Sequence, residues 1–388
     1  MAKLRRLQRA IDFIEHPSSS GIILLSCVII SLIIANSSLN DALNNILNSH
    51  PGTELSVSAW INDGLMAIFF LMAGLEIKRE IVEGELSDVK KATLPVLCAL
   101  GGMLFPAAIY ALLNQNLTTS AGWGIPMATD IAFAIAILNV LKKFIPASLR
   151  VFLTALAIVD DLGAIVVIAV FYSQGIHYDQ LLYAGGFFAL LLIFNAFQIK
   201  HIVFYLIPGI FIWYFIHHSG VHATVAGVLT AMAIPVKTRS GYQPVAALEH
   251  KLSNPVNFLI IPLFALANTN IRYEGGMLGE LFSPLGLGVI CGLVLGKPLG
   301  ILLMAWAAVK SKLSKLPVQA NWIHMAGMGL LAGIGFTMSI FIALLSFNTP
   351  ALQSEAKFAI LIASVLAASA GYICLKTYSS KQKAVANK

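Results

Sequence analysis

Residues 151–172, VFLTALAIVDDLGAIVVIAVFY, decide the fold of this chain. The run is apolar apart from Asp160 and Asp161, and it exceeds the roughly 20 residues that a helix needs to cross a bilayer. Arg150 marks its polar start, and a rise of 1.5 Å per residue puts Asp160 about 15 Å deep, near the middle of the hydrocarbon core. A charge there costs about 2.5–3.5 kcal/mol, so ionisable groups at this depth usually line an ion or proton pathway.

The composition predicts an all-α polytopic membrane protein. Hydrophobic residues make up 58% of the 388 residues, charged residues only 11%, and the mean hydropathy is +0.83. A soluble protein does not have enough polar surface to cover such a chain. Twelve apolar runs lie near 21–36, 59–77, 92–113, 121–141, 151–172, 181–199, 202–216, 221–234, 253–268, 284–309, 325–347 and 357–375.

The basic residues predict the orientation of these runs. The net charge is +7, but the lysines and arginines alternate between connections and do not gather into a basic patch, which argues against nucleic acid as a partner. All of them lie in the termini or in alternate connections except Arg272, Lys357 and the intramembrane Lys297. By the positive-inside rule both termini are cytoplasmic, and the even number of spans agrees with twelve.

We treat residues 1–388 as a single transmembrane domain, because no linker divides the chain. Residues 1–20 read as a cytoplasmic surface helix and 377–388 as a cytoplasmic tail. Residues 37–58 form the longest outer loop, in which Pro51-Gly52 and the alternating stretch 53–57 predict a short periplasmic β-hairpin and a candidate contact in a homodimer. The four cysteines lack metal or disulfide spacing, and we expect no cofactor.

Two spans carry helix-weakening residues in their middle. The fourth run contains Gly124, Pro126 and Asp130, and the eleventh contains Gly333 and Gly335. If spans 3–5 correspond to spans 10–12, the odd offset of seven predicts an inverted repeat with two broken helices at its centre. Close helix packing would also account for the glycines.

Four ionisable side chains lie deep in the predicted spans: Asp130, Asp160, Asp161 and Lys297. Together they would burden insertion by roughly 10–14 kcal/mol if unpaired, so they must face one another or water. Asp130 can compensate the positive ends of broken helices and Lys297 the negative ends. Neighbouring helical residues diverge by about 100°, so one acid can bind a cation while the other pairs with Lys297, and the residues alone leave open which acid does which.

This set of groups favours exchange of a small cation for protons. Na⁺ and Li⁺ prefer carboxylate, hydroxyl and carbonyl oxygens, which Asp160, Asp161, Thr129 and an unwound backbone supply. Competition between cation and proton for the same carboxylates would couple the two fluxes. Three alternatives are a purely structural ion-pair network, a proton- or sodium-coupled organic anion symporter, and an intramembrane aspartyl protease, whose acids lie on different helices.

A second group of candidates lies near the cytoplasmic ends of the spans. It comprises Glu76, Glu80, Glu249 and His250. A solvated helix end and an incidental histidine are the ordinary interpretations, and a cation-attracting or regulatory rim is the functional one.

Six stretches in order resemble bacterial sodium/proton antiporters of the NhaA family, and the resemblance covers essentially the whole chain. These stretches are GLEIKRE (74–80), ATDIAFA (128–134), ALAIVDDLGA (155–164), SGVHATVAGV (219–228), GKPLGI (296–301) and GIGFTMSIFIA (333–343). The resemblance implies twelve helices, an inverted repeat of spans 3–5 and 10–12 of which this family is a known example, crossed discontinuous spans 4 and 11, and a periplasmic hairpin supporting a homodimer.

The resemblance also implies an activity and residue roles. The activity is electrogenic, pH-regulated export of Na⁺ or Li⁺ in exchange for protons across the bacterial inner membrane, with no enzymatic reaction. Asp161 and Asp160 would be the cation and proton sites, Lys297 the partner of Asp160, and Asp130 and Thr129 would lie at the helix crossing. The resemblance associates the cytoplasmic mouth and the pH response with Glu76, Glu80, Glu249 and His250. Ser253 departs from the family, which has a second histidine there.

Overall fold

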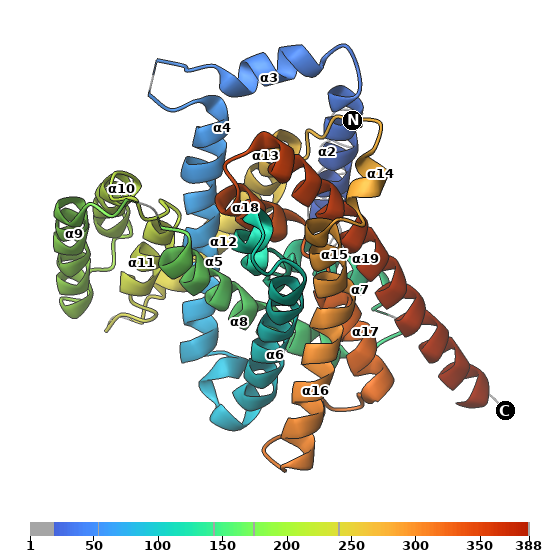
Figure 1. Cartoon of the computed structure of the whole chain (residues 1–388). Coiled ribbons are helices and arrows are strands. Elements are labelled where there is room, and N and C mark those ends of the chain that lie inside the picture. Colours follow the sequence, from blue (N-terminus) through green and yellow to red (C-terminus); the bar gives the residue numbers. More distant parts are fainter. Residues whose placement is uncertain (1–18, 53, 143, 174, 240, 387–388) are drawn as a thin grey trace, which may run out of the picture. The chain divides into compact units, whose positions relative to one another are not determined.

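A computed structural model describes residues 19–386, apart from 53, 143, 174 and 240. Within these residues every regular element is a helix and none is a strand (Figure 1). The predicted surface helix at 1–20 lies almost wholly outside the described residues. Residues 377–386 of the predicted tail continue the last helix.

The chain forms two compact units. The first consists of Met1–Ile33, Thr93–Asp160 and Ile271–Lys388, and the second of Ile34–Ala92 and Asp161–Asn270. The division passes between the two adjacent acids, along a single helix, α8 (Ala147–Phe171).

Most helices of the first unit come from the C-terminal third of the chain. They are α2 (Ser19–Ala35, continuing two residues into the second unit), α6 (Val89–Leu113, beginning there), η3 (Thr118–Met127), α7 (Ile131–Val140), α14 (Met277–Glu280), α15 (Pro284–Cys291), η5 (Gly292–Gly296), α16 (Lys297–Lys310), α17 (Trp322–Ala332), α18 (Phe336–Ser346) and α19 (Pro350–Ala386). Figure 1 shows α19 as the long red helix that ends at the C-terminus.

The second unit packs α5 against α11 and α12, and α10 against α9 and α11. Its elements are α3 (Asn40–Asn48), α4 (Val57–Ala59), η1 (Trp60–Leu65), α5 (Met66–Val82), η2 (Glu85–Ser87), α9 (Tyr178–Ala196), α10 (Val203–His217), α11 (Val225–Ala233), α12 (Pro244–Pro255), η4 (Val256–Ile260) and α13 (Ile261–Asn268). Leu75, Tyr205, Ile212 and Val245 belong to its apolar core.

The span that carries Lys297 is a continuous helix with one widened turn. Helices α15 and α16 are joined by the π-helical turn η5 and together run from Pro284 to Lys310. The turn directly precedes Lys297-Pro298. Because proline has no backbone N–H and crowds the preceding turn, a local π-helical adjustment lets the helix continue past it.

Glycines bring this span close to α6. A methyl group added at Gly296 would lie 2.9 Å from Cα of Pro106, and one added at Gly300 would overlap the carbonyl of Gly101. Small residues allow helix backbones to approach closely inside a membrane. The backbone around Lys297 is therefore held against α6 directly, which fixes where the lysine side chain begins.

Five described helices are long and apolar enough to cross a membrane, or up to eight if each sharply bent pair counts as one span. Two of the bent pairs are the predicted spans 4 and 11: η3 and α7 meet at 40°, and α17 and α18 at 46°. The polytopic, all-helical class is thus confirmed. The count of twelve stays a prediction, because breaks and π-helical turns shorten the continuous helices.

The predicted β-hairpin is not what the described residues of 37–58 form. Residues Asn40–Asn48 are the helix α3, and no strand occurs among the described residues that follow it. The alternating stretch 53–57 is too short to pair without a partner strand, and an isolated two-stranded hairpin is marginally stable in water. In α3, by contrast, Leu43 and Ile46 are three residues apart, which is helical spacing. Strand pairing therefore gives no basis for a dimer.

Candidate ion-binding site

Two fully buried side chains of opposite charge meet in the first unit. Lys297 is the first residue of α16, and Asp160 lies in the middle of α8. Nζ of Lys297 is 2.7 Å from Oδ2 of Asp160, and neither side chain is exposed. Removing one partner of such a pair costs about 3–5 kcal/mol, because the other charge is left buried alone. Each group therefore requires the other.

The hydroxyl of Thr129 also contacts this carboxylate. Its Oγ1 lies 2.7 Å from Oδ2 of Asp160 and 2.9 Å from the carbonyl oxygen of Ala332, the last residue of α17. A hydroxyl has one hydrogen and donates it to one acceptor at a time. Thr129 thus connects Asp160 to the end of a half-helix, and its hydrogen can move between the two.

The second oxygen of Asp160 differs from the first. Oδ1 is buried and accepts no hydrogen bond from any residue that the structure describes. Leaving a buried acceptor unsatisfied costs about 1–3 kcal/mol, and more if it is charged. A proton or a small cation would satisfy this oxygen.

Asp130 stabilises the start of two half-helices at once. Its Oδ1 accepts the backbone N–H of Phe133 in α7 (3.0 Å). Its Oδ2 accepts the backbone N–H of Thr337 in α18 (3.1 Å) and the Thr337 hydroxyl (2.5 Å). Helix N-termini carry partial positive charge and unpaired N–H groups, which a carboxylate satisfies. One buried acid therefore neutralises both positive ends.

The two breaks contact each other directly. The backbone N–H of Asp130 donates to the carbonyl of Ile334 over 2.6 Å, and the Ser339 hydroxyl donates to the carbonyl of Ile125 over 2.7 Å. Backbone groups freed by unwinding must find partners inside the protein, because lipid supplies none. Each broken span supplies partners for the other.

Lys297 also stabilises a helix end. Its ammonium donates to the carbonyl of Met127, the last residue of η3. A helix C-terminus presents unpaired carbonyls and partial negative charge, so a cation there is favourable. Lys297 therefore neutralises a negative helix end and Asp160 together.

Asp161 follows Asp160 on α8 and is the first residue of that helix to belong to the second unit. It is buried. One residue along a helix turns the side chain by about 100°, so the two acids point in different directions.

Comparison with known proteins identifies the family to which this chain belongs. A sequence model for the family described as Na+/H+ antiporter 1 matches residues 11–375. The chain belongs to this antiporter family. A protein of Flavobacterium johnsoniae named Na(+)/H(+) antiporter NhaA 2 is 56% identical over 391 residues, which cover 99% of this chain and 96% of the relative.

Two further relatives show how widely the family's sequence is shared. A Flavobacterium psychrophilum protein named Na(+)/H(+) antiporter NhaA is 48% identical over 97% of this chain and 98% of its own length. A Clostridium beijerinckii protein named Na(+)/H(+) antiporter NhaA 2 is 46% identical over 98% of this chain and 97% of its own. This member of the antiporter family is accordingly an integral membrane protein and a transporter, not an enzyme.

The structure of this antiporter-family chain also gathers most of the predicted cytoplasmic-mouth residues. Arg79 bridges two acids: NH1 is 2.9 Å from Oε1 of Glu80, and Nε is 2.8 Å from Oε2 of Glu249. Glu76, one turn before Glu80, interacts electrostatically with all three groups. His250 is exposed, and no hydrogen bond or ion pair of its side chain is found among the described residues. The structure therefore does not bring His250 into the acid cluster.

Sequence reasoning missed several polar contacts. Lys78 donates to the carbonyls of Met232 (2.6 Å) and Ile234, near the end of α11. Arg79 was not named as the bridge of the acid cluster, nor Thr337 as the partner of Asp130. Thr337 follows Gly333 and Gly335 and is the second residue of a half-helix, where an N-terminal hydroxyl is a recognisable signal.

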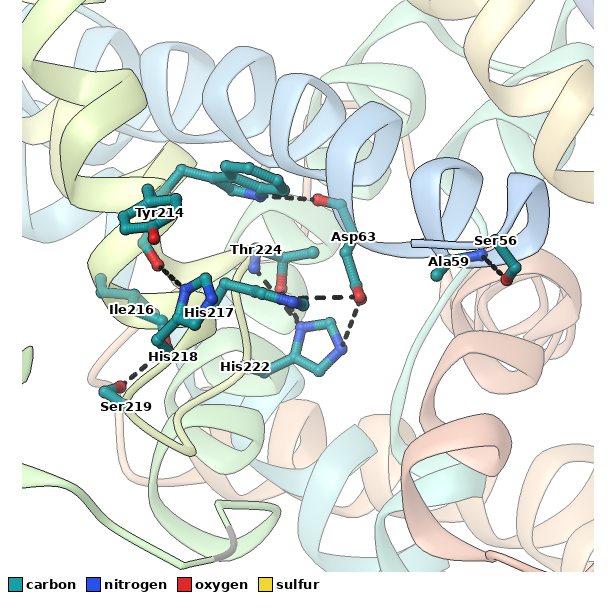
Figure 2. A network of polar contacts seen from close by, with 11 residues as sticks. Ser56, Ala59, Asp63, Tyr214, Ile216, His217, His218, Ser219, His222 and Thr224 are labelled. Carbon is teal, nitrogen blue, oxygen red and sulfur yellow. Dashed lines mark hydrogen bonds and ion pairs between the residues drawn. The ribbon is translucent and has the colours of Figure 1, made fainter. Parts of the chain in front are cut away.

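A further polar network is centred on Asp63 in η1. Oδ1 of Asp63 is 3.5 Å from Nε2 of His222, and its Oδ2 is 3.8 Å from Nδ1 of His217 (Figure 2). The Thr224 hydroxyl lies 2.8 Å from Nδ1 of His222 and fixes the orientation of the ring. Asp63 thus contacts both α10 and the segment before α11. Among the described residues, no group of three or more His, Cys, Asp or Glu is placed to hold a metal ion.

Proposed function

We propose that this chain is an electrogenic Na⁺(Li⁺)/H⁺ antiporter in which protons and the cation compete for Asp160 and Asp161. The observation that carries the proposal is a buried carboxylate, Asp160, held through Oδ2 by Lys297 and Thr129, while Oδ1 accepts no hydrogen bond from the described residues. Family membership supports the same activity.

The contacts suggest how one carboxylate can serve both ions. While Lys297 and Thr129 hold Oδ2 of Asp160, they compensate its charge at that oxygen and leave Oδ1 for a proton or the cation. If Asp160 takes a proton, its attraction for the ammonium falls, and the Thr129 hydrogen can turn to Ala332. We assign the cation to Asp161 with help from Asp160, Thr129 and unwound backbone carbonyls, since hard monovalent cations prefer oxygen ligands.

Electrogenic exchange follows if both carboxylates lose a proton when one monovalent cation binds. Two protons then cross the membrane in one direction for each cation that crosses in the other, so net charge moves in every cycle. The proton gradient and the membrane potential both drive such an exchange.

The same contacts weigh against the organic anion symporter. An anionic substrate would need a cation to bind it, and Lys297 is the only lysine or arginine in the interior of a predicted span. Its ammonium is committed to Asp160 and to the carbonyl of Met127.

We further propose that the acid cluster around Arg79 regulates exchange in response to pH. Glu76, Glu80 and Glu249 surround one guanidinium, so a change in their protonation alters the net charge of the cluster. His250 is proposed as a lesser contributor, because it lies outside these contacts.

The remaining features of the proposal concern topology. We propose twelve spans with both termini in the cytoplasm of a bacterial inner-membrane protein, an inverted repeat of spans 3–5 and 10–12 with crossed broken helices, and a homodimer. The distribution of lysine and arginine supports the orientation. Reporter fusions at the connections and cross-linking of single-cysteine variants test these points.

Exchange itself is tested in everted membrane vesicles that hold an imposed pH gradient. We expect NaCl and LiCl to dissipate the gradient and KCl not to. Asp161→Asn should abolish the response, and Asp179→Asn, at an exposed position in the first turn of α9, should leave it intact. If Asp161→Asn dissipated the pH gradient at the wild-type rate, Asp161 would not be part of the cation site.

A further inference from the structure

The second unit contains an apolar groove that plays no part in the proposed ion site. Its volume is about 710 Å³, and η1, α5, α10, α11 and α12 form most of its walls. The lining includes Ala67 and Leu71 from α5, Ile210 from α10 and Leu252 from α12. Thr230 is the lining hydroxyl, and it donates to the carbonyl of Ala226 in its own helix. The walls therefore offer a ligand apolar contact and little else.

One end of the groove is aromatic and polar. Trp60 and Trp213 stack there with ring centroids 5.8 Å apart, and Nε1 of Trp213 donates to the carbonyl of Asp63 over 3.1 Å. The Asp63 side chain lies between His217 and His222 (Figure 2). Tryptophan is enriched at the level of lipid headgroups, where its ring meets apolar chains and its N–H meets polar groups.

The length of the groove matches half a membrane. Along η1 and α5 the lining runs from Trp60 to Leu71, about 16 Å at 1.5 Å per residue. A single leaflet contributes about 15 Å to a hydrocarbon core about 30 Å thick. An apolar groove of one-leaflet length, with tryptophans and ionisable groups at one end, is complementary to an extended amphiphile with one apolar chain and a polar head.

We propose that this groove binds one acyl chain of a bilayer phospholipid, with the headgroup at the Trp60–Trp213 end. The chain contacts Ala67, Leu71 and Ile210, and the headgroup lies beside Asp63 and His217. The volume falls within the roughly 300–1,000 Å³ of ordinary ligand sites. The site does not depend on the proposed transport mechanism, because every lining residue belongs to the second unit.

The test uses the two tryptophans as reporters. The full chain, with Trp123, Trp306 and Trp322 replaced by Phe, is purified in detergent and titrated with phosphatidylcholine whose acyl chains carry bromine, a fluorescence quencher. We expect saturable quenching that reaches its plateau at one lipid per chain. Ala67→Phe fills the groove and should weaken this binding about fivefold, the equivalent of 1 kcal/mol. Ala189→Phe, on an exposed face of α9, should not change it.

Three outcomes would overturn the proposal. One is quenching that never saturates, and another is equal affinity in Ala67→Phe and Ala189→Phe. The third is a groove closed by a second copy of the chain, in which case quenching is absent and Ala67→Phe converts dimers to monomers. If Ala67→Phe does not fold, Ile210→Trp read by native mass spectrometry replaces it. Ile210 is 64% exposed, so a larger side chain there is tolerated, and the retained-lipid peak should fall by a similar factor.

Discussion

Lys297 donates to Oδ2 of Asp160 over 2.7 Å, and both side chains are completely buried. A lysine in the middle of a membrane-spanning helix is stable only with such a partner. The pair lies where Thr129 and the end of η3 also converge. Structural support and ion chemistry thus share one carboxylate, and variants can separate the two roles.

Replacing Lys297 should destabilise the protein far more than replacing both partners. Lys297→Met leaves Asp160 buried without its counter-charge and should lower the free energy of unfolding by about 3–5 kcal/mol. The double variant Asp160→Leu/Lys297→Met should recover most of this loss and still not exchange sodium for protons. Denaturant unfolding in mixed micelles and vesicle assays measure the two effects. A double variant that transports would contradict the role of the pair.

The Thr129 hydroxyl should contribute to cation affinity. Thr129→Val removes the donor to Asp160, a charge-assisted hydrogen bond whose loss should raise the KM for Na⁺ about tenfold. Thr129→Ser keeps the hydroxyl and should stay near the wild-type value. A wild-type KM in Thr129→Val would show that the hydroxyl does not contribute to cation affinity.

Asp130 should be mainly a stabilising residue. Asp130→Ala removes the acceptor of hydrogen bonds from Phe133 and Thr337, leaves two helix N-termini uncompensated, and should cost more than about 3 kcal/mol. Asp130→Asn keeps one oxygen and should fall between Ala and wild type. The stability series is measured by denaturant unfolding, with Asp179→Asn as the exposed control. A stable Asp130→Ala protein would mean that the two breaks do not depend on this acid.

Arg79 should set the pH at which exchange begins. Arg79→Gln removes the cation that Glu80 and Glu249 share. The negative charges of the cluster then repel one another without a compensating cation, so the pH profile of exchange should move away from that of wild type. Lys91→Gln breaks a longer, more exposed ion pair to Glu85 (3.6 Å) and should leave the profile in place. Identical pH profiles of exchange for the two variants would show that the acid cluster does not regulate exchange.

The sequence predicted the broken spans well because their signals are local. Proline, glycines and Asp130 lie within a few residues of each break, and an acid in an apolar run is favourable beside the positive end of a half-helix. The same reasoning could not decide whether Asp160 or Asp161 contacts Lys297. The two acids differ by about 100° around α8, and only the packing of α16 against α6 fixes where the ammonium lies.

Elsewhere, local patterns were weaker guides. The alternation at 53–57 predicted a strand, but strand pairing needs a partner that the described part of this loop does not supply, and α3 forms beside it. Thr337 was overlooked because its importance comes from Asp130, more than 200 residues away in the chain. Arg79 was overlooked for the same reason, because it connects Glu80 to Glu249, which lies on another helix.

The central claim, that protons and sodium compete for Asp160 and Asp161, is tested most directly by proton release from the purified protein. The full chain is held in weakly buffered detergent solution at a pH where the acids carry protons, and NaCl or LiCl is added while the pH is recorded. We predict a saturable release of protons by wild type that KCl does not produce, and no such release by the double variant Asp160→Asn/Asp161→Asn. Sodium binding without proton release by wild type, or equal release by the double variant, would contradict the account.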